Sequence, residues 1–86
     1  MYRVLLTGPA QRFFERADAD LQRRLDKCFE QLRRDPRALP NIRALRGEYA
    51  GHLRHRIGTC RVVYRINDTD RTVIVVVIAH RSRAYI

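Results

Sequence analysis

The sequence lacks most of the features that mark metalloproteins, nucleotide-binding domains and membrane proteins. Its 86 residues contain no tryptophan and only two cysteines, and no Cys/His cluster has the spacing of a metal site. There is no glycine-rich phosphate loop, and the longest apolar run, residues 73–79, is too short to span a bilayer. The first residues also lack the layout of a signal peptide. We therefore expect a cytoplasmic protein without metal or cofactor.

Acidic residues are half as frequent as basic ones, 9 against 18, which gives a net charge of +9. All but one of the basic residues are arginines, and Lys27 is the exception. Residues 42–86 hold nine arginines against three acidic residues, an excess of +6. Arginine suits forked contact with phosphate, so this balance indicates an anionic partner.

Apolar spacing predicts an initial strand followed by two helices. Residues 2–7 are rich in β-formers and end at Gly8-Pro9. Two stripes with helical spacing follow, namely Ala10, Phe13, Phe14 and Ala17, then Leu21, Leu25, Cys28, Phe29 and Leu32. The second helix should end before Asp35-Pro36. Because few residues join the helices, they should form an antiparallel αα-hairpin packed on a sheet.

Residues 53–64 predict a tight β-hairpin with Gly58 and Thr59 as a type II′ turn. Alternation then places Leu53, His55, Ile57, Cys60, Val62 and Tyr64 on a core face. The other face carries Arg54, Arg56 and Arg61. Arg56 should stand opposite Arg61, which costs stability because like charges repel. An anion would explain that arrangement, and solvated surface arginines are the simpler alternative.

A last strand, residues 72–79, follows a polar turn at 67–71 and is apolar on both faces. The order β-α-α-β-β-β predicts one α+β domain over residues 1–86, with the αα-hairpin on one face of a four-stranded, largely antiparallel sheet. We expect both cysteines, Cys28 and Cys60, to be free and buried. After the last strand come His80, Arg81, Arg83 and Tyr85. In the simple register His80 joins the arginine face, whereas a one-residue slip or bulge places Arg81 there.

Several arginines with a histidine and a tyrosine suit metal-free RNA cleavage, in which the ribose 2′-OH attacks the adjacent phosphorus. Arginines stabilise the charge that develops on the phosphate oxygens, but they are poor bases. The proton acceptor would be His80, Tyr85 or the substrate itself, and Arg81 would stabilise charge or protonate the leaving oxygen. Arg61 belongs with these candidate catalytic residues, and Arg54, Arg56 and Arg83 are candidate substrate-binding residues.

The chain resembles the RelE/ParE toxin superfamily of bacterial toxin–antitoxin systems over nearly its whole length. The resemblance rests on the element order, on Leu45-Arg46-Gly47, on the hairpin sequence from Arg54 to Tyr64, and on His80-Arg81 with Tyr85. It implies that Arg54, Arg56, Arg61, Arg81 and Tyr85 are the functional positions. Some active members have lysine at the first two of these, so arginine there shifts the expected proton acceptor to His80 or Tyr85.

The resemblance implies the toxin of a type II system, in its RelE-like branch of mRNA interferases, which are ribosome-dependent endoribonucleases that cut mRNA in the A site. It also implies a hetero-oligomer with a cognate acidic antitoxin that neutralises the basic face. Two alternatives stay open. One is a ParE-like DNA gyrase inhibitor that acts by protein binding, and the other is a non-catalytic basic module that binds nucleic acid.

Overall fold

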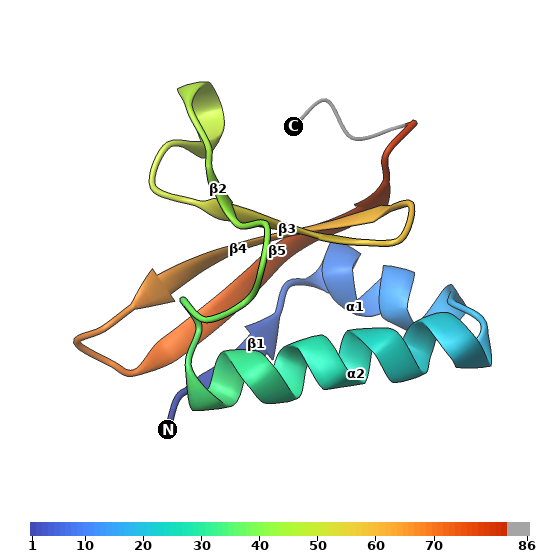
Figure 1. Cartoon of the computed structure of the whole chain (residues 1–86), viewed down its shortest axis with the longest axis horizontal. Helices are drawn as coiled ribbons and strands as arrows, with labels where there is room; N and C mark the ends of the chain where they lie inside the picture. Colours follow the sequence, from blue (N-terminus) through green and yellow to red (C-terminus); the bar gives the residue numbers. More distant parts are fainter. Residues whose placement is uncertain (83–86) are drawn as a thin grey trace.

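Two helices cover one face of a five-stranded sheet in the computed structural model of the protein, which describes residues 1–82 (Figure 1). The elements follow in the order β1 (Arg3–Leu6), α1 (Gly8–Arg16), α2 (Ala19–Arg34), β2 (Arg43–Ala44), the 3₁₀ turn η1 (Gly47–Tyr49), β3 (Leu53–Ile57), β4 (Cys60–Asn67) and β5 (Thr72–His80). The strands lie side by side in the order β1-β5-β4-β3-β2, with β1 parallel to β5 and the other neighbours antiparallel. The predicted α+β class is confirmed, as is the placement of both helices on one face.

The sheet has one strand more than the four that the sequence predicts. The additional strand, β2, is two residues long and places Arg43 opposite Arg54 and Ala44 opposite Leu53. Both residues of β2 are exposed, so the strand shows no alternation of buried and exposed side chains. Its backbone pairing with β3 extends the sheet beyond the predicted edge.

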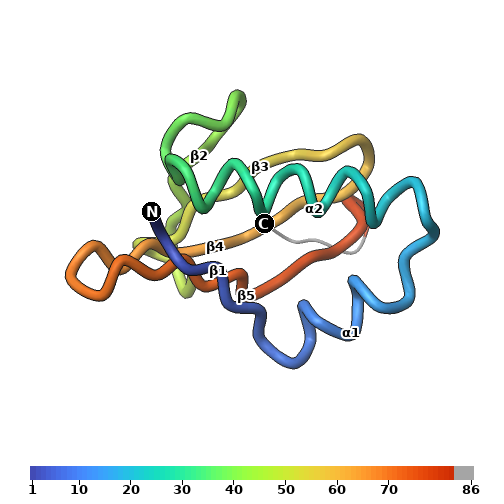
Figure 2. The backbone as a smooth tube through the Cα atoms, turned by 90° about the horizontal axis from the view of Figure 1, so that it is seen from below, coloured from blue at the N-terminus to red at the C-terminus, as the bar shows by residue number. Residues whose placement is uncertain are grey.

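Both helices begin at a side-chain cap. Thr7 Oγ1 accepts a hydrogen bond from the backbone N–H of Ala10 at 3.4 Å, and Asp18 Oδ1 accepts one from Leu21 at 2.8 Å. The second helix ends directly before Asp35-Pro36, as predicted. Figures 1 and 2 show α2 running back beneath the sheet after α1, so the two helices form the expected hairpin.

The core lies between the helices and the sheet. It consists of Ala10 from α1, Leu25, Cys28, Phe29 and Leu32 from α2, Val62 and Tyr64 from β4, and Val73, Val75 and Ile78 from β5. Burying a leucine or valine side chain contributes about 1.5–3 kcal/mol, so this layer supplies most of the driving force for folding. Both cysteines are free and buried, as predicted. Burial raises the pKa of Cys28 to about 12, which keeps its thiol protonated.

A β-bulge in β5 sets the register of the central strands. Val63 and Tyr64 of β4 pair with residues of β5 on either side of Val76, which has no partner across the ladder. The carbonyl of Val76 accepts a hydrogen bond from the Thr7 hydroxyl at 2.7 Å. Thr7 therefore caps α1 and binds the bulge at the same time.

The loop before β2 is held against the sheet by two side chains of the core face. The Tyr64 hydroxyl donates to the carbonyl of Pro36 at 3.1 Å. His55 Nδ1 lies 2.9 Å from the carbonyl of Pro40 and acts as the donor. The predicted inward orientation of both side chains is confirmed by their burial. These two bonds place the chain so that β2 can pair with β3.

Candidate functional site

The helices α1 and α2 leave one face of the sheet uncovered (Figure 1), and the register of β2, β3 and β4 places four neighbouring arginines on that face. Arg43 comes from β2, Arg54 and Arg56 come from β3, and Arg61 comes from β4. Arg43 stands opposite Arg54, and Arg56 stands opposite Arg61. Opposite residues share a face, and so do residues two apart on one strand. We call these four residues the arginine cluster.

The β3–β4 hairpin has the predicted register, from Leu53 opposite Tyr64 to Ile57 opposite Cys60. A type II′ turn requires a positive φ at its first central residue only. Gly58 has a φ of +56° and Thr59 has no positive φ, so the predicted turn type is present. The turn therefore fixes the register that brings two members of the arginine cluster face to face.

No carboxylate neutralises the arginine cluster within residues 1–82. The ion pairs of this part of the chain join Arg23 and Arg24 to Asp20, Arg34 to Glu30, and Arg37 to Asp68. The pKa of Arg54 is lowered by burial and further by the positive charges of Arg61, Arg43 and Arg56. The cluster therefore opposes folding electrostatically.

Arg61 carries a polar atom without a partner. Its Nε is buried and makes no hydrogen bond to any of the described residues. Buried donors are almost always paired, because an unsatisfied one costs about 1–3 kcal/mol. An anion with oxygen acceptors would both satisfy this nitrogen and relieve the repulsion in the cluster. The arrangement has the chemistry of a binding site for phosphate or another oxyanion.

Arg81 extends the cluster beyond the end of β5. Its backbone N–H donates to the carbonyl of Thr59 at 2.7 Å, which continues the pairing with the β4 side of the hairpin. The bulge at Val76 places Ala79 opposite Arg61. Arg81 is in the turn directly after β5, and we infer from continuing the alternation of the strand by one residue that it is directed to the face of the arginine cluster. Of the two registers that the sequence left open, the structure has the bulged one.

His80 lies on the other face of the sheet, against α1. It stands opposite Cys60, and its Nδ1 lies 3.6 Å from the Cys60 sulfur. Its ring centroid is 5.4 Å from that of Phe13. The sheet therefore separates His80 from the arginine cluster. The extra residue Val76 is the physical reason, because without it His80 would share the face of the arginines.

Two predicted site residues, Arg83 and Tyr85, lie outside the residues that the structure describes. The described candidates that share one face are Arg54, Arg56, Arg61 and Arg81. The structure thus brings together four of the predicted site residues and leaves His80 apart from them.

Arg43 and the cleft beside it were not predicted from the sequence. This cleft, of about 310 Å³, is lined by Asn41, Ile42, Arg43, Arg54 and Arg56. The feature of the sequence that could have indicated β2 is the return of the chain to the sheet at Leu45. In the structure the Leu45 N–H donates to the carbonyl of His52 at 3.0 Å. Extending that antiparallel return backwards by two residues would have placed Arg43 opposite Arg54.

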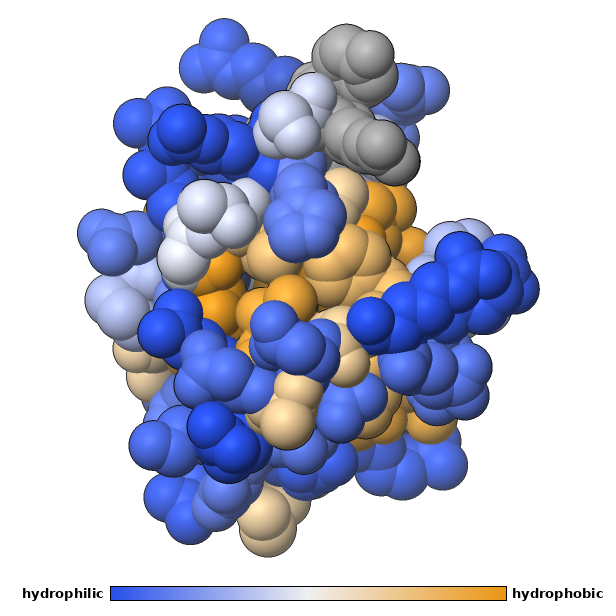
Figure 3. Space-filling view, turned by 90° about the vertical axis from the view of Figure 1, so that its right-hand side faces the viewer, coloured by the Kyte–Doolittle hydropathy of each residue, from blue (hydrophilic) through white to orange (hydrophobic). Residues whose placement is uncertain are grey.

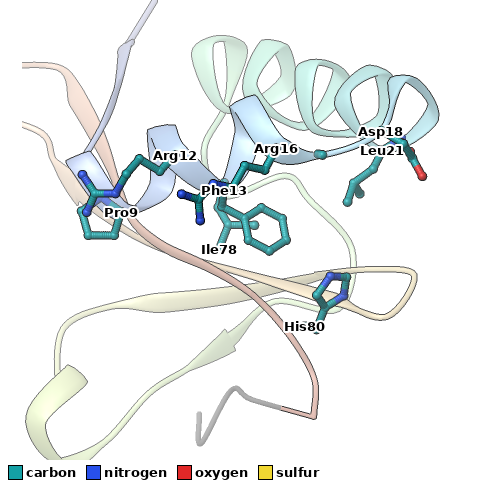
Figure 4. Close-up of a pocket in the computed structure, with 9 residues that line it drawn as sticks. Pro9, Arg12, Phe13, Arg16, Asp18, Leu21, Ile78 and His80 are labelled. Carbon is teal, nitrogen blue, oxygen red and sulfur yellow. The ribbon is translucent and has the colours of Figure 1, made fainter.

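A larger cavity, of about 620 Å³, lies between α1, the start of α2 and the end of β5 (Figure 4). Its apolar lining includes Phe13, Leu21 and Ile78, and its charged lining consists of Arg12, Arg16 and Asp18. Figure 3 shows apolar surface near the centre of this side of the molecule, surrounded by hydrophilic residues. This groove is suited to apolar side chains of a partner and lies on the helix side of the sheet.

Within residues 1–82 there is no group of three or more His, Cys, Asp or Glu side chains that could hold a metal ion. In the same part of the chain, no helix has both the length and the apolar character needed to cross a membrane.

The sequence model of the family described as the ParE toxin of the type II toxin–antitoxin system parDE matches residues 4–85. The chain belongs to this toxin family. The toxin also resembles a chain of the RelBE2 toxin–antitoxin complex from Mycobacterium tuberculosis, with 31% identity and a TM-score of 0.80. That match covers 93% of the toxin and 98% of the other chain. The expected membership of the RelE/ParE superfamily is therefore confirmed.

Two further solved structures share the fold of the toxin at lower identity. One is the archaeal RelE–RelB complex from Pyrococcus horikoshii, with 24% identity, a TM-score of 0.82, and 96% and 98% of the two chains covered. The other is a YoeB/ParE toxin from Agrobacterium tumefaciens, with 23% identity, a TM-score of 0.80, and 91% and 96% covered. A comparison with curated proteins finds no match.

Proposed function

We propose that the toxin is a RelE-like mRNA interferase that cleaves mRNA in the ribosomal A site and thereby stops translation in the cytoplasm. The arginine cluster carries this proposal, above all the buried Nε of Arg61, which has no hydrogen-bond partner among residues 1–82. Guanidinium groups bind phosphate oxygens in a forked geometry, and fixed positive charge is what phosphoryl chemistry needs. Charges that repel one another in the free protein are suited to a substrate that supplies the missing negative charge.

In the proposed reaction the ribose 2′-oxygen forms a bond to the adjacent phosphorus, and the bond from phosphorus to the 5′-oxygen breaks. The products are a 2′,3′-cyclic phosphate and a free 5′-hydroxyl. Arg61 stabilises the charge that builds on the non-bridging oxygens, and Arg81, directly after β5, stabilises it as well or protonates the leaving oxygen. Arg54 and Arg56 hold the RNA backbone beside them, and Arg83 is proposed to extend that contact.

The proton of the 2′-hydroxyl must pass to a base within hydrogen-bond reach. His80 does not meet that condition, because it lies across the sheet from the arginine cluster. The proposed acceptors are therefore Tyr85 and the phosphate of the substrate itself. Arginine is unsuited to this step since it stays protonated.

The proposed partner is an acidic antitoxin that forms a hetero-oligomer with the toxin. Two features favour it: the excess of positive charge, and the groove between α1 and β5 with its apolar lining and its arginines. Apolar side chains of an acidic segment would fill the groove while its carboxylates contact the arginines. The M. tuberculosis and P. horikoshii relatives are toxin–antitoxin complexes.

A second candidate function is inhibition of DNA gyrase by protein binding, and the match to the ParE family favours it. This function needs no stabilisation of a phosphate. It therefore predicts that toxicity survives the loss of Arg61 or Arg81.

Controlled expression of the toxin and of Arg61→Ala separates the two functions. The proposal predicts growth arrest with mRNA cuts inside translated codons, detected by primer extension, and loss of both in the variant. Arg65→Ala is the matched control, since Arg65 is an exposed arginine of the same strand. Intact mRNA together with gyrase inhibition would refute the proposal and support the second candidate.

A further inference from the structure

The arginine cluster consists of two arginine pairs rather than one group. Arg56 and Arg61 form the first pair across β3 and β4, and Arg43 and Arg54 form the second across β2 and β3. The two pairs are two residues apart along β3, which is roughly 7 Å at the rise of a β-strand. This separation is of the order of one nucleotide step along an extended strand.

The second pair opens into a cleft that is also lined by Arg56 of the first pair. Asn41, Ile42, Arg43, Arg54 and Arg56 line about 310 Å³ of space, whereas Arg61 is not among its lining residues. Asn41 contributes an amide that can donate to an oxygen. It adopts a φ of +58°, a conformation that asparagine tolerates better than most residues. The cleft therefore combines three guanidinium groups and an amide, and one of its arginines, Arg56, stands directly opposite Arg61.

Electrostatics couple the two pairs. The positive charges that act on Arg54 are those of Arg61, Arg43 and Arg56, so all four belong to one field. No ion pair within residues 1–82 involves Arg43 or Arg54. A single phosphate at Arg61 would leave the charge of the second pair without a counterpart. Two phosphates on one strand would neutralise both pairs.

We propose that Arg43 and Arg54, with Asn41, form a second phosphate position that holds the backbone phosphate next to the one bound at Arg61. This proposal rests on the proposed RNA-cleaving function and assigns to the toxin a run of at least two phosphates of a single strand. Arg43 binds and orients the strand, and Arg61 acts at the phosphate that reacts. The cleft thereby fixes the direction in which the strand crosses the sheet.

The first test measures binding of a single-stranded RNA oligonucleotide with a 2′-deoxy nucleotide at the cleavage position, over a range of salt concentrations. Arg43→Gln should weaken binding roughly tenfold, because a charged hydrogen-bonded contact is lost. It should also reduce the slope of log K against log salt by about 0.7, the value for one phosphate of a single strand. Arg43→Lys should recover the slope but only part of the affinity, since it keeps the charge without the fork.

Arg65→Gln is the matched control, because Arg65 is an exposed arginine of β4 on the same face of the sheet as Arg61 but does not line the cleft. An unchanged slope in Arg43→Gln, or equal losses in Arg43→Gln and Arg65→Gln, would overturn the second phosphate position. The proposed cleavage would still stand in that case, because it depends on Arg61 and Arg81.

The second test uses inorganic pyrophosphate as a probe and follows the arginine Nε–H signals of the intact toxin by NMR. The proposal predicts saturable shifts at Arg43 and Arg54 as well as at Arg61. Shifts at Arg61 alone would overturn it. If the shifts occur at all three residues but no RNA is ever cleaved, the anion site stands and the proposed cleavage fails, so the two results are distinguishable.

Discussion

Replacement of Arg61 by methionine should make the toxin more stable while abolishing its activity. The substitution removes a buried donor that lacks a partner, which costs about 1–3 kcal/mol. It also removes the repulsion with Arg56 directly opposite, which costs about 0.2–1 kcal/mol. Methionine keeps an unbranched apolar stem where the arginine stem lay. Allowing for imperfect repacking, we expect a gain of about 1–2 kcal/mol in the free energy of unfolding.

Urea unfolding of the two proteins at one pH measures this gain. For a domain of this size, each kcal/mol gained in the free energy of unfolding should raise the melting temperature by about 4–8 °C. Salt should reduce the difference in part, because it screens the repulsion between the arginines but leaves the buried nitrogen unpaired. Pyrophosphate should also reduce the difference in stability between the two proteins, since a ligand that binds only the folded wild type stabilises that protein.

Arg65→Met is the control for the loss of one charge. Arg65 is exposed on the same strand, so the change should stay within about 0.5 kcal/mol. If Arg61→Met proves less stable than the wild type, the Arg61 guanidinium has a structural partner and does not serve to bind an anion.

Three further predictions concern the parts of the fold that hold the site in place. Tyr64→Phe leaves the carbonyl of Pro36 without its donor and should lower the free energy of unfolding by about 1–2 kcal/mol; an unchanged urea midpoint would show that the bond contributes nothing. Burial lowers the pKa of His55 below its usual 6.5, so the unfolded chain binds a proton at His55 more tightly than the folded protein does. The free energy of unfolding should therefore be highest above pH 6.5 and fall as the pH drops below that value. His55→Gln should flatten that loss between pH 7 and 5, and equal pH slopes in the two proteins would contradict the assignment. Thr7→Val removes the α1 cap and the hydrogen bond to Val76, so we expect a loss of about 1–2 kcal/mol in the free energy of unfolding. Amide exchange around the bulge should become faster, and an unchanged exchange rate there would argue against a role of Thr7 in holding the bulge.

The hairpin could be predicted from the sequence residue by residue. Gly58 occupies the turn position that needs a positive φ, and side chains alternate strictly from Leu53 to Tyr64. These two features together allow only one register of the hairpin. The second helix was predictable for a similar reason, because Asp18 and Asp35-Pro36 mark its two ends. Local chemistry determines these elements, and the tertiary structure agrees with it.

The register of β5 could not be predicted in the same way. Residues 73–79 are apolar throughout, so shifting the strand by one residue leaves its hydrophobic pattern unchanged. In the structure the bulge comes with a contact between residues distant in sequence, the hydrogen bond from Thr7 to the carbonyl of Val76. The bulged register places His80 opposite Cys60, on the face away from the arginine cluster.

The most direct test of the proposed function incubates purified toxin with ribosomes that hold a defined mRNA and examines the ends of the RNA. We expect a cut in the A-site codon that leaves a 2′,3′-cyclic phosphate and a free 5′-hydroxyl. Arg61→Ala should yield no product, whereas Arg65→Ala should cut as the wild type does. Intact mRNA on ribosomes exposed to the wild-type toxin, in a preparation that inhibits DNA gyrase, would contradict the proposed function.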